Sequence, residues 1–336
     1  MLLCLAFSTA AACSSGSMGT PGSGGAPASG TGGAAAGGSG GSTSVGGAGG
    51  SGNPNAIVGS FNVTLVEAMG TTVAQTKVIG VVRDGPQPEA VIFVKGAADG
   101  ACALYIPHVP FCSTPCGGSA ACVADDKCQD YPVAKDVGTV TVTGVASSTG
   151  AGSFPLTSVG GSYSPVGVTP SYPPFAEGDD VSVSTTGGAY APFSIHAKGV
   201  APLVLGSDTY NLQRGQPLSV SWTAAGAAAS STIHVKVDVS HHGGTKGQIL
   251  CDTADSGSLT ISGALVTMLM DLGVSGYPSI VVTRSSVGTA AIPPGQVRLL
   301  LSQDVERYIQ IPGLTSCLED TDCPTGKTCQ KDLQCQ

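Results

Sequence analysis

The chain has 336 residues, of which 14 are basic and 22 acidic, and its formal net charge is −8. The basic residues are scattered singly instead of forming a stripe, which excludes nucleic acid as an expected partner. Only 11% of the residues are charged and 5% are aromatic, whereas glycine alone contributes 50. This composition favours short strands joined by turns over long surface helices, so we expect a mainly β fold.

Residues 1–13 predict a lipoprotein signal peptide. An apolar run ending at Phe7 is followed by small residues and then by Cys13. Small residues before the cleavage site are typical of exported chains, and Cys13 is the expected lipid attachment point. Two features depart from the usual pattern, because Ala10 stands where leucine is common and no basic residue precedes the apolar run. The alternative is cleavage after Ala12, which would release a soluble secreted protein.

Residues 14–54 form a Gly/Ser-rich linker that we expect to be disordered. A coil of this length has a root-mean-square reach of roughly 35 Å, so it would tether a folded body to a membrane. No later segment holds about 18 uninterrupted apolar residues, so nothing is expected to span a bilayer. The remaining chain divides into a β-rich body at 55–312, with a Cys-rich insertion at 110–131, and a Cys-rich module at 313–336.

Period-two alternation of apolar residues predicts many short strands with one buried face. Near-continuous apolar runs at 78–82, 91–94 and 280–282 predict strands buried on both faces. With the turn signals between them, these strands indicate an antiparallel β-sandwich or a barrel-like body. The alternating positions are Phe61, Val63 and Leu65; Val140 and Val142; Leu218, Val220 and Trp222; Ile233, Val235, Val237 and Val239; and Val297, Leu299 and Leu301.

One segment predicts a short helix. Ser262 is a suitable N-cap, and Gly273 is a suitable stop after the last apolar position. We expect this helix to pack over a sheet edge or a barrel mouth. Its apolar residues at helical spacing are Leu265, Met268, Leu269 and Leu272.

Ten cysteines follow the linker, and an even number in an exported chain implies up to five disulfides. Two clusters share a six-residue spacing. A zinc site is the competing interpretation, but structural zinc sites pair cysteines about two to four residues apart, so we favour disulfides. The ten are Cys102, Cys112, Cys116, Cys122, Cys128, Cys251, Cys317, Cys323, Cys329 and Cys335.

Four cysteines allow three connectivities, and spacing alone does not choose among them. For the C-terminal module we expect the interlocked pairs Cys317 with Cys329 and Cys323 with Cys335. If each cluster closes on itself, Cys102 and Cys251 remain and should bond to each other. That bond would tie the first half of the folded region to the second.

Residues 234–255 contain the best candidates for catalysis or metal binding, because imidazoles and carboxylates gather there. The competing interpretation is a solvated strand face that runs into a glycine hairpin, since adjacent histidines point to opposite sides of an extended chain. We therefore expect no catalytic residue, metal or cofactor. The weak metal candidates are His234, His241, His242, Asp252 and Asp255.

Several segments together resemble the uncharacterised secreted lipoproteins of myxobacterial type. Beside the signal and the linker, they are PFCSTPCGGSAACVADDKCQDYP, SHHGGTKGQILCDTADSGSL and CLEDTDCPTGKTCQKDLQC. The resemblance implies export and a lipid anchor. It implies no activity, since none is established for that family.

The first functional hypothesis is a non-enzymatic cell-surface lipoprotein that serves in binding, adhesion or envelope structure. Its partners would be the outer membrane, through the lipid anchor, and an unknown protein or glycan ligand. The folded part would then face an oxidising compartment. The alternatives are a metal-dependent or hydrolytic enzyme with a site near 234–255, and an inhibitor-like role for the Cys-rich module.

Overall fold

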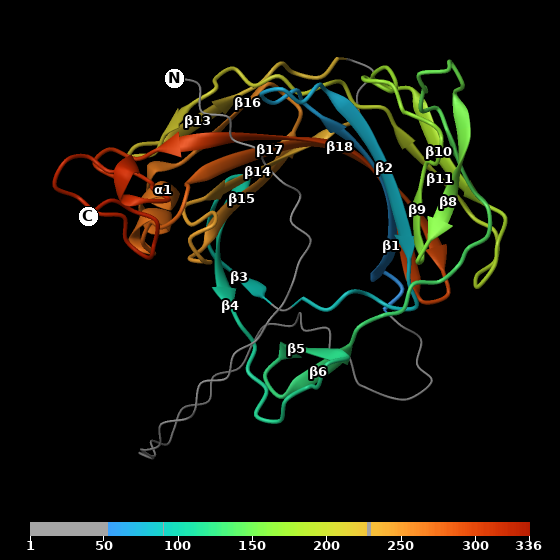
Figure 1. Ribbon diagram of the computed structural model, residues 1–336, viewed down its shortest axis with the longest axis horizontal. Coiled ribbons are helices and arrows are strands. Elements are labelled where there is room, and N and C mark those ends of the chain that lie inside the picture. The colour runs from blue at the N-terminus through green and yellow to red at the C-terminus, as the bar shows by residue number, and fades with distance from the viewer. Residues whose placement is uncertain (1–52, 90, 227–229) are drawn as a thin grey trace. The chain divides into compact units, whose positions relative to one another are not determined.

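The computed structural model describes residues 53–89, 91–226 and 230–336 (Figure 1). The predicted signal peptide, with Cys13, and all but the last two residues of the predicted linker lie outside the described residues. The elements are β1 (Ile57–Val66), β2 (Gln75–Val82), β3 (Ile92–Asp99), β4 (Cys102–His108), β5 (Ala120–Ala124), β6 (Lys127–Asp130), β7 (Val140–Thr143), β8 (Ser153–Val159), β9 (Ser162–Ser164), β10 (Asp180–Thr185), β11 (Ser194–Lys198), β12 (Tyr210–Asn211), β13 (Leu218–Ser221), β14 (Thr232–Asp238), β15 (Gln248–Ala254), β16 (Ser258–Ile261), α1 (Gly263–Asp271), β17 (Ser279–Ile292), β18 (Gly295–Gln310) and the 3₁₀ turn Asp320–Asp322.

Fourteen strands form one large sheet that is not closed. Its order is β11-β10-β7-β8-β9-β2-β1-β18-β17-β14-β15-β4-β3, and β12 pairs with β18 off this path. Two-stranded sheets are formed by β13 with β16 and by β5 with β6. The expected mainly β fold with one short helix is therefore confirmed. It differs from a purely antiparallel body because β1 and β12 both run parallel to β18.

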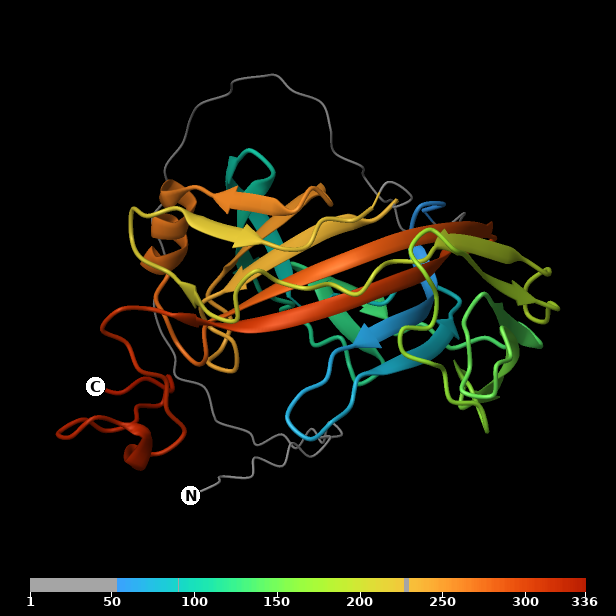
Figure 2. The ribbon, with the colours of Figure 1, turned by 90° about the horizontal axis from the view of Figure 1, so that it is seen from above.

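Two hydrophobic cores share the long β17–β18 hairpin, which runs from the side of the helix to the opposite side of the body in Figure 2. One core, which we call the helix-side core, contains Val282 and Val305 and is covered by β13, β16 and α1. The other, the N-terminal core, contains Leu299 and Leu301 and lies between β1 and β18 on one side and β7, β10 and β11 on the other. Sandwich packing on each half of a single hairpin explains why no barrel closes.

The alternating strands are buried as predicted, because every position of that pattern has less than a tenth of its surface exposed. Two of the runs predicted to be buried on both faces are not. In β2 the burial alternates and Ile79 is half exposed. β3 is the last strand of the sheet and is exposed over most of its length. An apolar run can lie on an edge strand, and its position in the sheet is decided by contacts far away in the sequence.

The predicted helix is confirmed as α1. The side chain of Ser262 accepts a hydrogen bond from the backbone of Leu265, as an N-cap does. Gly273 adopts a φ of 93°, which favours glycine and ends the helix. The helix contacts β3, β4 and β15, so it packs at an edge of the sheet as expected. Within the described residues, no helix has the length and apolar character needed to cross a bilayer.

All ten later cysteines form disulfides. Cys102 and Cys251 face each other across β4 and β15 and bond as predicted, joining positions 149 residues apart. The C-terminal module has the expected interlocked pairs. Residues 110–131, which we call the arm, contain the β5–β6 hairpin and the bonds Cys112–Cys122 and Cys116–Cys128.

The C-terminal module is docked on the body through Gly276. The carbonyl oxygen of Gly276 accepts hydrogen bonds from Ser316 Oγ at 2.6 Å and from Gln334 Nε2 at 2.7 Å. The amide of Gly276 donates to the carbonyl oxygen of Asp332 at 2.7 Å. Cys317 and Cys335 are buried, so two cross-links replace the apolar core that this short module lacks.

Candidate functional site

The candidates of residues 234–255 fall into three separate environments. His234 of β14 and Asp252 of β15 are register partners, and His234 Nδ1 lies 2.8 Å from Asp252 Oδ1. Both side chains are open to solvent, with exposures of 38% and 85%. On the other side of His234, Thr283 donates to Asp304 Oδ1 at 2.6 Å. This row is a solvated polar face of the sheet.

His241 and His242 lie in the turn after β14. Their ring centroids are 3.9 Å apart, and His242 has a φ of 62°. The backbone is therefore not extended there, and the expectation that the two rings point to opposite sides is wrong. His241 Nε2 lies 3.7 Å from Glu306 Oε1, away from the pair formed by His234 and Asp252.

Within the described residues, the groups of three or more potential ligands close enough to hold one metal ion consist of cysteines. They are Cys112, Cys116 and Cys128 in the arm, and Cys317, Cys323 and Cys335 in the C-terminal module. Each of these sulfurs is bonded in a disulfide. Because a disulfide sulfur has no thiolate to offer a metal, the disulfide interpretation prevails over zinc in both clusters.

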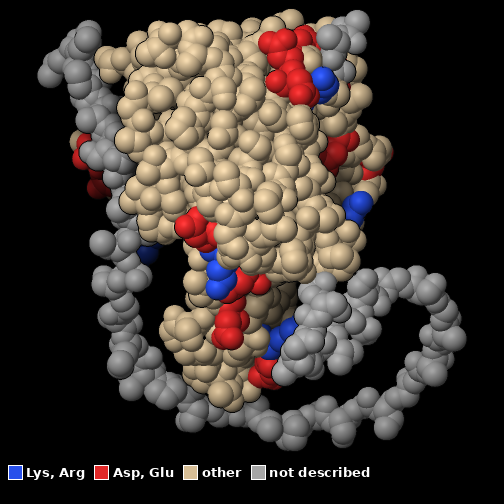
Figure 3. Space-filling model, turned by 90° about the vertical axis from the view of Figure 1, so that its right-hand side faces the viewer, with Lys and Arg blue, Asp and Glu red and all other residues tan. Residues whose placement is uncertain are grey.

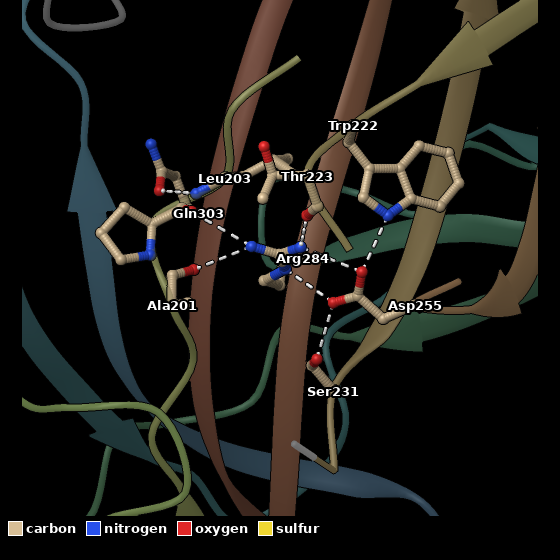
Figure 4. A network of polar contacts seen from close by, with 9 residues as sticks. Ala201, Leu203, Trp222, Thr223, Ser231, Asp255, Arg284 and Gln303 are labelled. Carbon is tan, nitrogen blue, oxygen red and sulfur yellow. Dashed lines mark hydrogen bonds and ion pairs between the residues drawn. The ribbon is translucent and has the colours of Figure 1, made fainter. Parts of the chain in front are cut away.

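Asp255 does not join the histidines but forms a buried ion pair with Arg284 of β17 (Figure 4). Asp255 Oδ2 accepts from Arg284 Nε at 2.6 Å, and Oδ1 accepts from Nη2 at 2.9 Å. Trp222 Nε1 and Ser231 Oγ each donate to the same carboxylate at 2.7 Å. The two charged side chains are only 1% and 4% exposed.

Every nitrogen of the Arg284 guanidinium has an acceptor. Nη2 also donates to the carbonyl oxygen of Thr223 at 2.6 Å, and Nη1 donates to those of Pro202 and Ala201 at 3.1 and 3.3 Å. Ala201 and Pro202 lie in the loop after β11, and Thr223 lies just after β13. The network therefore ties both segments to the shared hairpin.

The electrostatics of Asp255 couple this network to pH. Burial alone would raise its pKa, but hydrogen bonds from Arg284, Ser231 and Trp222 and the charge of Arg284 outweigh burial, and the pKa lies below its ordinary value. A carboxyl group whose pKa is lower in the folded state than in the unfolded state stabilises the fold at pH values above its unfolded pKa. That stabilisation is lost as the pH falls through the pKa of the folded state.

Arg284 is absent from the site residues predicted above, although the sequence holds a signal for it. Ile280, Val282 and Arg284 alternate in phase, so the arginine occupies an inward position of a buried strand. Its register partner Gln303 is likewise in phase with Leu301 and is also buried. These polar positions lie where one hydrophobic core ends and the other begins. The hydrogen-bond partners of Arg284 and Gln303 could be identified only from the tertiary structure.

The arm is flanked by exposed apolar side chains. Large apolar side chains are exposed at both of its ends or within two residues of them. Phe111 is 71% exposed, and its backbone amide donates to Asp125 Oδ1 at 3.0 Å. The far end of the arm is attached to the body, because Gln129 Nε2 donates to the carbonyl oxygen of Pro86 at 2.9 Å. The exposed residues are Val109, Phe111, Tyr131 and Val133.

Comparisons with known proteins identify no family. No protein-family model matches the chain, and no curated protein matches it. Among solved structures, the FN1–FN3 domains of chicken CNTN1 are similar over 70% of this chain and 72% of that chain, with 8% identity and a TM-score of 0.18. A similarity at that TM-score carries no argument about function. The five disulfides, by contrast, place the folded part in an oxidising compartment outside the cytosol.

Proposed function

We propose that this chain is a lipid-anchored cell-surface protein whose role is to bind a partner through the arm. Export is supported by the five closed disulfides and by the signal-like sequence before Cys13. The anchor and the linker would hold the folded body at a distance from the membrane, where it can meet other molecules.

The observation that carries the binding role is the exposed apolar set at the ends of the arm. Exposed apolar side chains on a segment held by two disulfides lose little conformational entropy when they are covered by a partner. Aromatic residues such as Phe111 and Tyr131 are also enriched among those that dominate protein interfaces. On the face drawn in Figure 3, most of the surface is neither acidic nor basic. We therefore assign a protein partner rather than a glycan to the arm.

The anchor is tested by replacing Cys13 with serine. The hydroxyl of serine does not accept the lipid in place of the thiol, so the Cys13→Ser chain is expected to move from the membrane fraction to the soluble exported fraction. Fractionation and mass spectrometry of the mature N-terminus measure both changes. If the chain without the substitution carries no lipid and is found in the soluble fraction, the anchor is contradicted and cleavage after Ala12 is supported.

The arm is tested with the Phe111→Ser variant. Labelled, soluble Cys13→Ser protein is expected to bind intact cells of the producing organism, and Phe111→Ser is expected to weaken this binding about ten-fold or more, since truncation of a central aromatic contact costs about 2 kcal/mol. Flow cytometry at increasing protein concentration measures the affinity.

Val159→Ser is the matched control, because Val159 is 68% exposed but lies in β8 outside the arm. It should bind as the parent does. Equal binding by the Phe111→Ser and Val159→Ser proteins would remove the arm from the proposal.

A further inference from the structure

A cavity on the face of β1 and β18 opposite the N-terminal core contains two arginines. Its volume is about 480 Å³, and its polar lining residues are Ser60, Arg83, Gln87, Glu89 and Arg298. A second cavity of about 290 Å³ shares Ser60 and Arg83 with it. We call the first of these the arginine cavity. It lies beside the attachment of the arm, since Asp84 and Pro86 accept hydrogen bonds from Val133 and Gln129.

The fold brings the two arginines together from opposite sides of β1. Arg298 of β18 is the register partner of Ser60, and Arg83 directly follows β2 and donates its amide to the carbonyl oxygen of Val58. Strands on either side of a third lie roughly 10 Å apart. Both residues are out of phase with their buried neighbours Val82 and Val297, so both side chains extend from the face opposite the N-terminal core. Long side chains can converge over that distance.

These arginines differ from the other three in the chain. Arg214, Arg284 and Arg307 each form an ion pair with an aspartate or a glutamate. In the described part of the chain, the contacts of Arg83 and Arg298 are to neutral acceptors instead. Arg298 Nε donates to Ser60 Oγ at 3.3 Å. With the Gln87 amide oxygen turned toward Arg83, that oxygen accepts from Nε at 2.8 Å and from Nη2 at 3.2 Å.

We propose that the arginine cavity binds the carboxylate of an acidic sugar through Arg83 and Arg298. A guanidinium presents its N–H groups in a planar fork that matches a carboxylate, and such charge-assisted hydrogen bonds are stronger than neutral ones. The proposal does not depend on the binding role of the arm, because the cavity and its charges stand without a protein partner.

The lining determines which anion is favoured. Its charged side chains are two arginines and Glu89, so they give a net charge of +1 in a chain whose net charge is −8. One excess positive charge suits a monoanion such as a carboxylate better than a phosphate dianion. Gln87, Glu89 and Ser60 can exchange hydrogen bonds with hydroxyl groups. The volume falls within the range of about 300–1,000 Å³ that is usual for small-molecule sites.

Isothermal titration calorimetry of the soluble Cys13→Ser chain with three probes tests this. Glucuronate is expected to bind, whereas glucose, which has the same ring and no carboxylate, should bind at least ten-fold more weakly. Inorganic phosphate should also bind more weakly than glucuronate. A glucuronate oligomer is included as a fourth probe to distinguish two kinds of ligand. If the ligand is a polysaccharide, the oligomer should bind at least as tightly as the monomer. If it is a free sugar acid, the monomer should bind more tightly.

Variants assign the binding to the two arginines. Arg83→Gln and Arg298→Gln should each weaken glucuronate binding by roughly ten-fold or more, and added salt should weaken binding to the parent protein. Lys198→Gln is the control, because it removes the same charge from an exposed residue of β11 that pairs with Asp180. If the parent protein binds glucuronate no more tightly than glucose, the proposal is overturned, whatever the variants show. Tighter binding of phosphate would overturn the choice of a carboxylate, and unchanged binding by both arginine variants would overturn the site.

Discussion

Replacing Arg284 with methionine is expected to lower the free energy of unfolding by about 3–5 kcal/mol. The variant leaves the Asp255 carboxylate buried with its charge uncompensated, and it removes the donors to three backbone carbonyl groups between residues 201 and 223. Urea denaturation followed by circular dichroism measures the loss. Trp222, the only tryptophan in the chain, reports the same transition by fluorescence.

A second variant separates the ion pair from simple packing. In Arg284→Met/Asp255→Leu the buried charge is gone as well, so part of the lost stability should return, because a buried ion pair can be replaced by apolar residues at little cost. Arg214→Met is the matched control. Its pair with Asp271 is more than half exposed, and its loss should cost at most about 1 kcal/mol. A cost for Arg284→Met no larger than that for Arg214→Met would show that the network does not tie these backbone segments to the shared hairpin.

Removing the Cys102–Cys251 disulfide by replacing both cysteines with alanine is expected to cost about 5 kcal/mol. This bond joins positions 149 residues apart, and in the chain-entropy model a longer closed loop restricts the unfolded chain more. Both cysteines are buried against the helix-side core, so a small loss of packing adds to the effect. Urea denaturation without reductant measures the change.

The arm provides the control for this second prediction. Cys112→Ala/Cys122→Ala opens a bond between positions only 10 residues apart, in a segment that contributes to neither hydrophobic core. It should leave the midpoint of the main transition in place and make the arm susceptible to proteolysis. If the two double variants lower the midpoint equally, the long disulfide has no special role in joining the halves of the body.

Local patterns in the sequence were sufficient wherever near neighbours decide the structure. Alternation identified the buried faces of β1, β7, β13, β14 and β18, because residues two apart share a face of any strand. Ser262 and Gly273 marked the ends of α1, because a cap involves only the residues beside it. The even number of cysteines and their clustering predicted five disulfides and the Cys102–Cys251 bond, whereas the pairing within each cluster of four was decided by the tertiary structure.

Contacts between distant segments were decided only by the tertiary structure. The apolar run in β3 did not reveal an edge strand, because the place of a strand in a sheet depends on which strands pair with it. Asp255 was grouped with the histidines by sequence proximity, but it points inward to Arg284, while His234 and Asp252 lie on the solvent face. Arg83 and Arg298 are 215 positions apart in the sequence and line the same cavity because β2 and β18 flank β1. Sequence specifies which faces are buried, and the pairing of strands across long loops specifies which side chains meet on them.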